Sequence, residues 1–174
     1  MKILKKNYDV TGIGSALLDF MVSVDEDFLS SLGLNKGGMH LIDEERSREI
    51  FRKIKDYNLT IIPGGSSANT VAGVSSLNGK GAFIGRVADD DNGGIYVSQT
   101  LDSGVKSCIS RGKGITGHAI TFITPDLERT FATHLGAALD LSPDDVDLTV
   151  VENSSVLHLE GYLFEADNLM EVCF

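Results

Sequence analysis

Short apolar runs alternate with amphipathic stretches along most of the chain. Runs rich in β-branched and aromatic residues, bounded by turn residues, predict strands over residues 8–13, 16–24, 39–42, 60–63, 82–84, 107–109 and 156–160. Helices are predicted over residues 44–57, 67–77 and 94–103, the first with Ile50, Phe51 and Ile54 on one face. Strands that alternate with helices are typical of the α/β class, with a mainly parallel sheet flanked by helices.

Two later segments depart from this alternation. Residues 117–124 and 129–134 are extended and are separated by Pro125-Asp126-Leu127-Glu128, a turn sequence, so they predict a β-hairpin. Together with the early strands, the hairpin suggests a second, small sheet that acts as a lid, with its strands within about residues 16–42 and 117–134. Ser142-Pro143 marks a short helix, and a last helix is predicted from Glu165. No linker or repeat divides the chain, so residues 1–174 are expected to lie within one domain.

Residues 64–93 contain the pattern that most directly suggests a ligand. Gly64-Gly65 follows a predicted strand, and Asn69 lies on the first turn of the helix behind it. Glycines let the main chain approach a ligand closely, and a helix N-terminus offers N–H donors to hydroxyl or anionic groups. The same residues also suit a tight strand-to-helix turn with a capping Asn and no ligand. Both interpretations stay open from these residues alone.

Composition and charge argue against two classes of partner. The chain has 174 residues, 42% hydrophobic and 23% charged, as in a globular protein of about one domain. Its net charge is -10 and its 15 Lys and Arg residues are scattered, so neither a nucleic acid nor a membrane surface is expected as a partner. Cys108 and Cys173 lie far apart, and Asp9 and Asp19 interrupt the first apolar runs. We therefore expect a reduced, cytoplasmic protein without a signal peptide.

Common cofactor and metal motifs are incomplete. Residues 12–17 begin like a dinucleotide-binding fingerprint, but the third glycine position is Leu17. The four histidines are isolated in the sequence. Asp89-Asp90-Asp91 has no His or Glu at ligand spacing, so this run predicts a solvated loop entering a helix and no metal site.

Residues 64–93 resemble the first signature of the ribokinase-like (PfkB) carbohydrate and nucleoside kinases. In that signature a Gly-Gly pair, an Asn after a short spacer and a glycine-rich strand end line the sugar site. Residues 14–19, Gly-Ser-Ala-Leu-Leu-Asp, are similar to the first-strand motif of the adenosine kinase-like branch, in which the Asp holds the ribose hydroxyls. The resemblance covers essentially the whole chain. It implies a Rossmann-like α/β fold with a lid, and a kinase that uses ATP and Mg²⁺.

The resemblance also implies roles for individual residues. The substrate-binding residues would be Asp19, Gly64, Gly65, Asn69, Ser15, Met39 and Tyr162. Arg129 would be a catalytic residue that reaches toward the transferred phosphate. Taken alone, Arg129 also suits an exposed position in the hairpin, and Asp19 suits the end of a turn. Met39 and Tyr162 also suit positions in the core. Ser15 stands where the branch has Asn, which opens the site to sugars or to nucleosides other than adenosine.

Part of the implied enzyme lies outside this sequence. No Gly-Ala-Gly-Asp motif occurs, so the family's general base, ATP site and metal motif are not expected here. The chain would then be the acceptor-binding part and lid of a kinase that phosphorylates a hydroxymethyl group of an adenosine-like nucleoside or a sugar. A phosphorylated sugar is a further acceptor class, with Arg86 and Arg129 as its evident phosphate partners. The alternative is a non-catalytic α/β binding or interaction module. An apolar open lid face is also typical of pairing with a second copy, so a homodimer through the lid is a further expectation.

Overall fold

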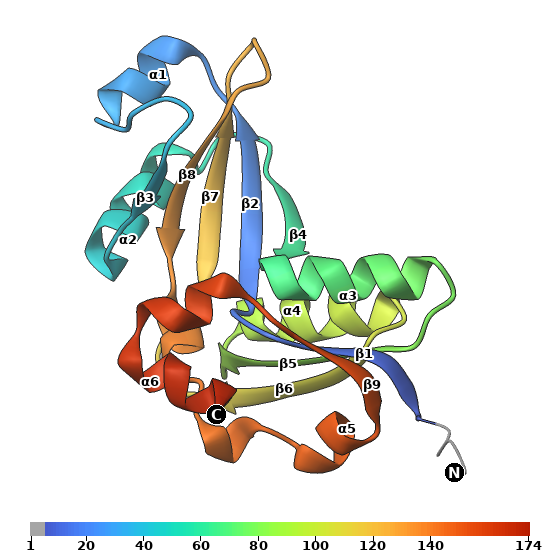
Figure 1. Cartoon of the computed structure of the whole chain (residues 1–174). Helices are drawn as coiled ribbons and strands as arrows, with labels where there is room; N and C mark the ends of the chain where they lie inside the picture. The colour runs from blue at the N-terminus through green and yellow to red at the C-terminus, as the bar shows by residue number, and fades with distance from the viewer. Residues whose placement is uncertain (1–5) are drawn as a thin grey trace.

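Two β-sheets form the fold, and helices pack against each of them (Figure 1). The computed structural model describes residues 6–174. The first sheet has four parallel strands in the order β6-β5-β1-β9. These strands are β1 (Tyr8–Ile13), β5 (Gly81–Ala88), β6 (Lys106–Gly112) and β9 (Ser154–Leu159). The predicted α/β class with a parallel sheet flanked by helices is therefore confirmed.

Both faces of the four-stranded sheet are packed. Phe83 of β5 belongs to a core cluster with side chains of α3 and α4, whereas the next residue, Ile84, belongs to a cluster with Leu141 and Leu163. Successive side chains of a strand point to opposite faces, so a continuous apolar run such as β5 is expected at the centre of such a sheet. The covering elements are α3 (Ser66–Ser76) and α4 (Asp91–Asp102) on one side, and η1 (Gly136–Asp140), η2 (Pro143–Asp145) and α5 (Leu148–Glu152) on the other.

The second sheet has five strands in the order β3-β8-β7-β2-β4. β7 and β8 pair antiparallel, which confirms the predicted hairpin. The sheet also includes β4, which lies outside the ranges predicted for it, because β4 pairs antiparallel with β2. Its strands are β2 (Leu17–Ser23), β3 (Met39–Leu41), β4 (Thr60–Gly64), β7 (His118–Ile123) and β8 (Arg129–His134).

Helices α1 (Glu26–Ser31) and α2 (Glu44–Lys53) cover the back of the second sheet (Figure 1). The core between them includes Val22, Leu29, Ile50 and Phe122, all nearly inaccessible to solvent. The front of this sheet carries the alternate side chains, including Leu17, and faces the site described below.

Three segments differ from the sequence-based prediction. Helix α1 was not predicted; Asp25 caps it by accepting a hydrogen bond from the Phe28 amide at 2.7 Å. Helix α2 ends at Lys53, before the predicted 57. In place of one helix from Glu165, three short elements follow β9, because Ala166 adopts an extended conformation and interrupts the helical turns. These elements are η3 (Gly161–Glu165), α6 (Asp167–Met170) and η4 (Glu171–Cys173).

One edge of the four-stranded sheet is formed by β9. Its Val156 and Leu157 are 55% and 43% exposed, although they point to opposite faces of the sheet. Within residues 6–174, none of the helices is long and apolar enough to cross a membrane.

Candidate functional site

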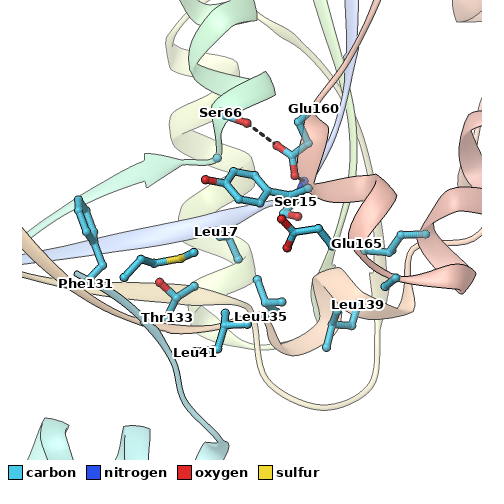
Figure 2. Close-up of a pocket in the computed structure, with 15 residues that line it drawn as sticks. Ser15, Leu17, Leu41, Ser66, Phe131, Thr133, Leu135, Leu139, Glu160 and Glu165 are labelled. Atoms are coloured by element: carbon cyan, nitrogen blue, oxygen red, sulfur yellow. Dashed lines mark hydrogen bonds between the residues drawn. The ribbon is translucent and has the colours of Figure 1, made fainter. Parts of the chain in front are cut away.

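A cavity of about 470 Å³ lies between the front of the five-stranded sheet and the ends of the four-stranded sheet (Figure 2). One wall comes from three strands of the five-stranded sheet: Leu17 on β2, Met39 and Leu41 on β3, and Phe131 and Thr133 on β8. The cavity is therefore built by strands that are distant in sequence and become neighbours only through the sheet order β3-β8-β7-β2-β4.

The other wall comes from the segments that follow β1 and β9, from the N-terminus of α3, and from η1 with its N-cap residue. Its polar members are Ser15, Ser66, Glu160 and Glu165, and the aromatic member is Tyr162. Leu135, Leu139, Ala166 and Leu169 complete it with apolar surface. The carboxyl ends of parallel strands are the usual position of ligand sites in α/β sheets.

The Gly64-Gly65 turn joins β4 to α3 at the boundary of the two sheets. Gly65 has φ +96°, a conformation that disfavours residues with a Cβ, and a Cβ there would lie 2.2 Å from the Ser15 carbonyl oxygen. The hydroxyl of buried Tyr96 donates to the Gly64 carbonyl at 3.0 Å. Burial raises the pKa of Tyr96, with smaller contributions from Glu160 and Asp19, so its hydroxyl keeps the proton that it donates. The turn is thus fixed at Gly64 by the Tyr96 hydrogen bond and at Gly65 by close packing against the Ser15 carbonyl.

Glu160 binds three groups at this boundary, a role that sequence reasoning missed. It is 3% exposed, and its carboxylate accepts hydrogen bonds from the Ser15 amide at 2.7 Å and the Ser66 hydroxyl at 2.9 Å (Figure 2). The Ser67 amide also donates to it, at 3.3 Å. Gly65, the N-cap of α3, has no side chain to cap the helix, so Glu160 supplies the negative group that this N-terminus favours. The one signal in the sequence was a Glu at the end of a predicted parallel strand.

Asp19 lies on the same face of β2 as Leu17, which lines the cavity. Burial raises the pKa of the Asp19 carboxyl above its ordinary value, and the positive charge of Arg129 partly offsets that rise. Arg129 is exposed on β8, with its guanidinium 5.9 Å from the centre of the Phe131 ring. The positive charge of Arg129 therefore acts on the Asp19 carboxyl across the front of the five-stranded sheet and favours its ionised form.

The structure brings together some of the predicted site residues. Four of them, Ser15, Met39, Gly65 and Tyr162, line the cavity directly. Asp19 and Gly64 contact each other beside it. Asn69 is exposed on α3 and does not line the cavity, and neither does Arg129. The roles assigned to all eight residues stay predictions.

The charge of the cavity is one-sided. Two carboxylates, Glu160 and Glu165, line it, and no Lys, Arg or His does so within residues 6–174. Arg86, one of the two phosphate partners considered for a phosphorylated sugar, instead forms hydrogen bonds to both oxygens of Asp145 at 2.8 Å. The lining therefore suits neutral hydroxyl and amino groups better than an anionic one.

The acidic run Asp89-Asp90-Asp91 lies where a helix-entry loop was predicted. Asp90 is the N-cap of α4 and accepts a hydrogen bond from the Gly93 amide at 2.7 Å. It also accepts hydrogen bonds from the amide and the hydroxyl of Thr116, at 2.9 and 2.5 Å. Partial burial acts to raise the pKa of Asp90, but these donors together outweigh it and lower the pKa below its ordinary value. Asp90 therefore has a structural role at this helix start.

Comparison with known proteins identifies relatives of the chain. The family model described as pfkB family carbohydrate kinase matches residues 39–172. Guanosine-inosine kinase of Escherichia coli (strain K12) is 26% identical over 161 residues, which cover 88% of this chain and 37% of that protein.

Two solved structures superpose on most of the chain. A probable sugar kinase from Rhizobium etli CFN 42 is 34% identical with a TM-score of 0.87, covering 96% of this chain and 51% of that one. Adenosine kinase from Sinorhizobium meliloti is 36% identical with a TM-score of 0.85, covering 94% and 50%. The chain thus spans about half the length of these solved relatives and 37% of the Escherichia coli protein.

Proposed function

The chain belongs to the pfkB family of carbohydrate kinases, and on that premise we propose that it forms the acceptor-binding part of an ATP-dependent kinase that phosphorylates a hydroxymethyl group of a nucleoside. The five-stranded sheet is the lid of this acceptor site. Because the chain spans about half the length of its solved relatives, the activity proposed is that of a protein of their length.

One observation carries the choice of a nucleoside. The cavity joins a polar end at Ser15, Ser66 and Glu160 to apolar and aromatic walls at Met39, Leu41, Phe131 and Tyr162. A nucleoside has the same division, with a polyol at one end and a flat, weakly polar base at the other. A free hexose carries hydroxyl groups all round and would leave the apolar walls without a partner.

In this proposal Asp19 and the Gly64-Gly65 turn bind the ribose. A carboxylate accepts hydrogen bonds from two neighbouring hydroxyls, and such charge-assisted bonds contribute about 1.5–3 kcal/mol each. The pKa of Asp19 is raised by burial in the protein without ligand, so hydroxyl donors and nearby Arg129 would favour its ionised form. Arg129 is assigned to the phosphoryl group, which is negatively charged, rather than to the ribose.

ATP and Mg²⁺ are the expected co-substrate and metal of the full-length kinase. Residues 6–174 contain no group of three His, Cys, Asp or Glu side chains that could hold a metal ion, so the described residues do not fit Mg²⁺. We therefore assign both to the part of the relatives' length that this chain does not cover. No proton transfer is assigned to a residue of this chain.

A sugar acceptor is the second candidate, because the solved relative from Rhizobium etli CFN 42 is described as a probable sugar kinase. Phosphorylated sugars fit less well, since no cation lines the cavity in the described part of the chain. A non-catalytic binding or interaction module is the alternative that involves no acceptor.

Isothermal titration calorimetry of the 174-residue chain with adenosine, inosine, fructose and ribose separates these candidates. We expect saturable nucleoside binding that Asp19→Asn weakens about tenfold, the effect of one charge-assisted hydrogen bond. Asp56→Asn, at an exposed position outside the cavity, is the matched control and should bind like the wild type.

The other outcomes distinguish the alternatives. Binding of fructose or ribose in preference to nucleosides would replace the nucleoside with the sugar acceptor. Binding of none of the four compounds, or binding that is indifferent to Asp19→Asn, would favour the non-catalytic module.

A further inference from the structure

We propose that Glu165 determines base specificity by accepting a hydrogen bond from an N–H group on the Watson–Crick edge of a purine base. This inference rests on the proposed nucleoside site. It adds Glu165, to which the sequence pattern gave no role in binding. The class of ligand it selects is a purine nucleoside with an N–H donor at the amino or ring nitrogen of that edge.

The local backbone presents Glu165 to the same space as Tyr162. Both belong to η3 (Gly161–Glu165), a 3₁₀ helix, in which side chains three residues apart are eclipsed. Both line the cavity. Leu163 of the same helix is fully buried in the core beneath, which fixes the rotation of η3 about its axis.

Within the described residues, the Glu165 carboxylate has no hydrogen-bond partner, unlike that of Glu160. Three protein donors already occupy the oxygens of Glu160. Within residues 6–174, by contrast, no hydrogen bond or ion pair involves the Glu165 side chain. Figure 2 places Glu165 on the opposite side of the cavity from Phe131, Thr133 and Leu41 of the five-stranded sheet.

The wall that carries Glu165 also has apolar surface that suits a base. Ala166, Leu169 and Leu139 line the same cavity and offer no side-chain donor. A flat ring held between Tyr162 and the apolar lid residues would present its edge, not its face, to this carboxylate. The aromatic residue would thus stack on the base while the carboxylate reads its edge.

The chemistry of the carboxylate sets the expected selectivity. An ionised carboxylate accepts hydrogen bonds and donates none. Adenosine offers the 6-amino group and inosine offers N1–H, but purine riboside has no N–H donor on that edge. Glu165 is exposed in the protein without ligand, so a bound base has to cover its carboxylate. An analogue without a donor then leaves this acceptor desolvated and unpaired, and the site rejects it.

The test compares these three nucleosides by isothermal titration calorimetry on the 174-residue chain and on Glu165→Ala. In the wild type we expect purine riboside to bind about tenfold more weakly than adenosine and inosine, a penalty typical of one lost hydrogen bond to a charged group. In Glu165→Ala that difference should fall to within about twofold, because no acceptor remains to distinguish the ligands. Asp167→Ala removes a nearby exposed carboxylate that does not line the cavity and should keep the full difference.

The comparison among ligands in the wild type does not depend on the variant folding. Equal binding of purine riboside and adenosine, or a difference that persists in Glu165→Ala, would overturn the role of Glu165 and leave the nucleoside site intact. No binding of any nucleoside by the wild type would overturn the proposed function, and this inference with it. Glu165→Gln, which keeps one acceptor oxygen, should give an intermediate difference.

Discussion

The carboxylate of Asp19 lies directly against Gly64, so that a Cβ at Gly64 would be only 2.6 Å from Asp19 Oδ2. β2 and β4 pair with Leu17 opposite Gly64 and Asp19 opposite Ile62, which sets this diagonal approach. The position of the carboxylate therefore depends on glycine at residue 64. The same contact joins the two sequence motifs that first suggested a ligand site.

Gly64→Ala should displace the Asp19 carboxylate. We expect nucleoside affinity to fall at least about tenfold and stability to fall by about 1–3 kcal/mol, as for other insertions of a methyl group into a packed site. Calorimetry and urea unfolding would measure the two effects. The matched control is Gly73→Ala in α3, where a Cβ meets nothing within 4 Å; it should stabilise the protein by about 0.5–1 kcal/mol. Unchanged affinity in Gly64→Ala would contradict the role given to this contact.

Asp19→Asn should make stability less dependent on pH at the acidic end. Because burial raises the folded-state pKa of Asp19, the folded protein retains this proton at pH values where the unfolded chain has lost it. Its contribution to stability is therefore fully present below the ordinary carboxyl pKa of 3.8 and is lost as pH rises through the folded-state pKa. At pH 7 we expect Asp19→Asn to be more stable than the wild type while binding nucleosides more weakly. Urea unfolding between pH 3.5 and pH 7 checks this, and a stability difference that stays constant over that range would count against it.

Glu160→Gln should weaken the hydrogen bonds at the boundary between the two sheets and lower the stability of the protein. The amide group of Gln would face one of the N–H donors that now bind a carboxylate oxygen, from Ser15 or Ser67. We expect a loss of about 1.5–3 kcal/mol in the free energy of unfolding, the range for hydrogen bonds to a charged group. Glu165→Gln makes the same chemical change in the same cavity, at a carboxylate that no donor of residues 6–174 pairs with, and should change stability by less than about 0.5 kcal/mol. Similar losses in both variants would argue against a special role of Glu160.

His118 should make stability fall as pH falls, which is opposite to the effect of Asp19. It begins β7, with Nδ1 hydrogen-bonded to the Thr116 carbonyl at 3.0 Å and Nε2 to the Ser47 hydroxyl at 2.6 Å. Burial lowers its pKa and nearby His134 lowers it further, against the effects of the Thr116 hydrogen bond and Asp90. The unfolded chain therefore takes up a proton near pH 6.5, whereas the folded protein takes it up only at lower pH, so stability falls as pH falls through 6.5.

A comparison of His118→Gln with the wild type isolates that response. The slope of unfolding free energy against pH between 5.5 and 7 should be shallower in the variant, by at most about 1.4 kcal/mol per pH unit for one proton. Parallel pH profiles would mean that His118 does not remain neutral in the folded protein.

The order of strands and helices could be read from the sequence because it depends on local patterns. The hairpin at Pro125-Asp126-Leu127-Glu128 and the parallel strands followed from turn chemistry and from the alternation of elements. Helix α1 was missed because its six residues are too few to show a helical repeat, and it is fixed by a cap and by burial of Leu29. The inclusion of β4 in the second sheet could not be read either, since pairing partners are a property of the fold.

The candidate site was predictable only in part, for the same reason. Gly64, Gly65 and Asp19 belong to short motifs, whereas Glu160 acquires its role from Ser15, a residue 145 positions away. The apolar wall from β3 and β8 depends on the order of strands in the five-stranded sheet. Side chains that meet only after folding leave no spacing in the sequence to recognise.

The outer side of β9 also has a bearing on how this polypeptide behaves in solution. No strand within residues 6–174 pairs with that side, so its amide and carbonyl groups are satisfied by water or by another extended segment. With Val156 and Leu157 exposed beside them, these groups form a ready template for intermolecular β-pairing. Aggregation at high concentration is therefore a hazard to expect when these residues are prepared on their own.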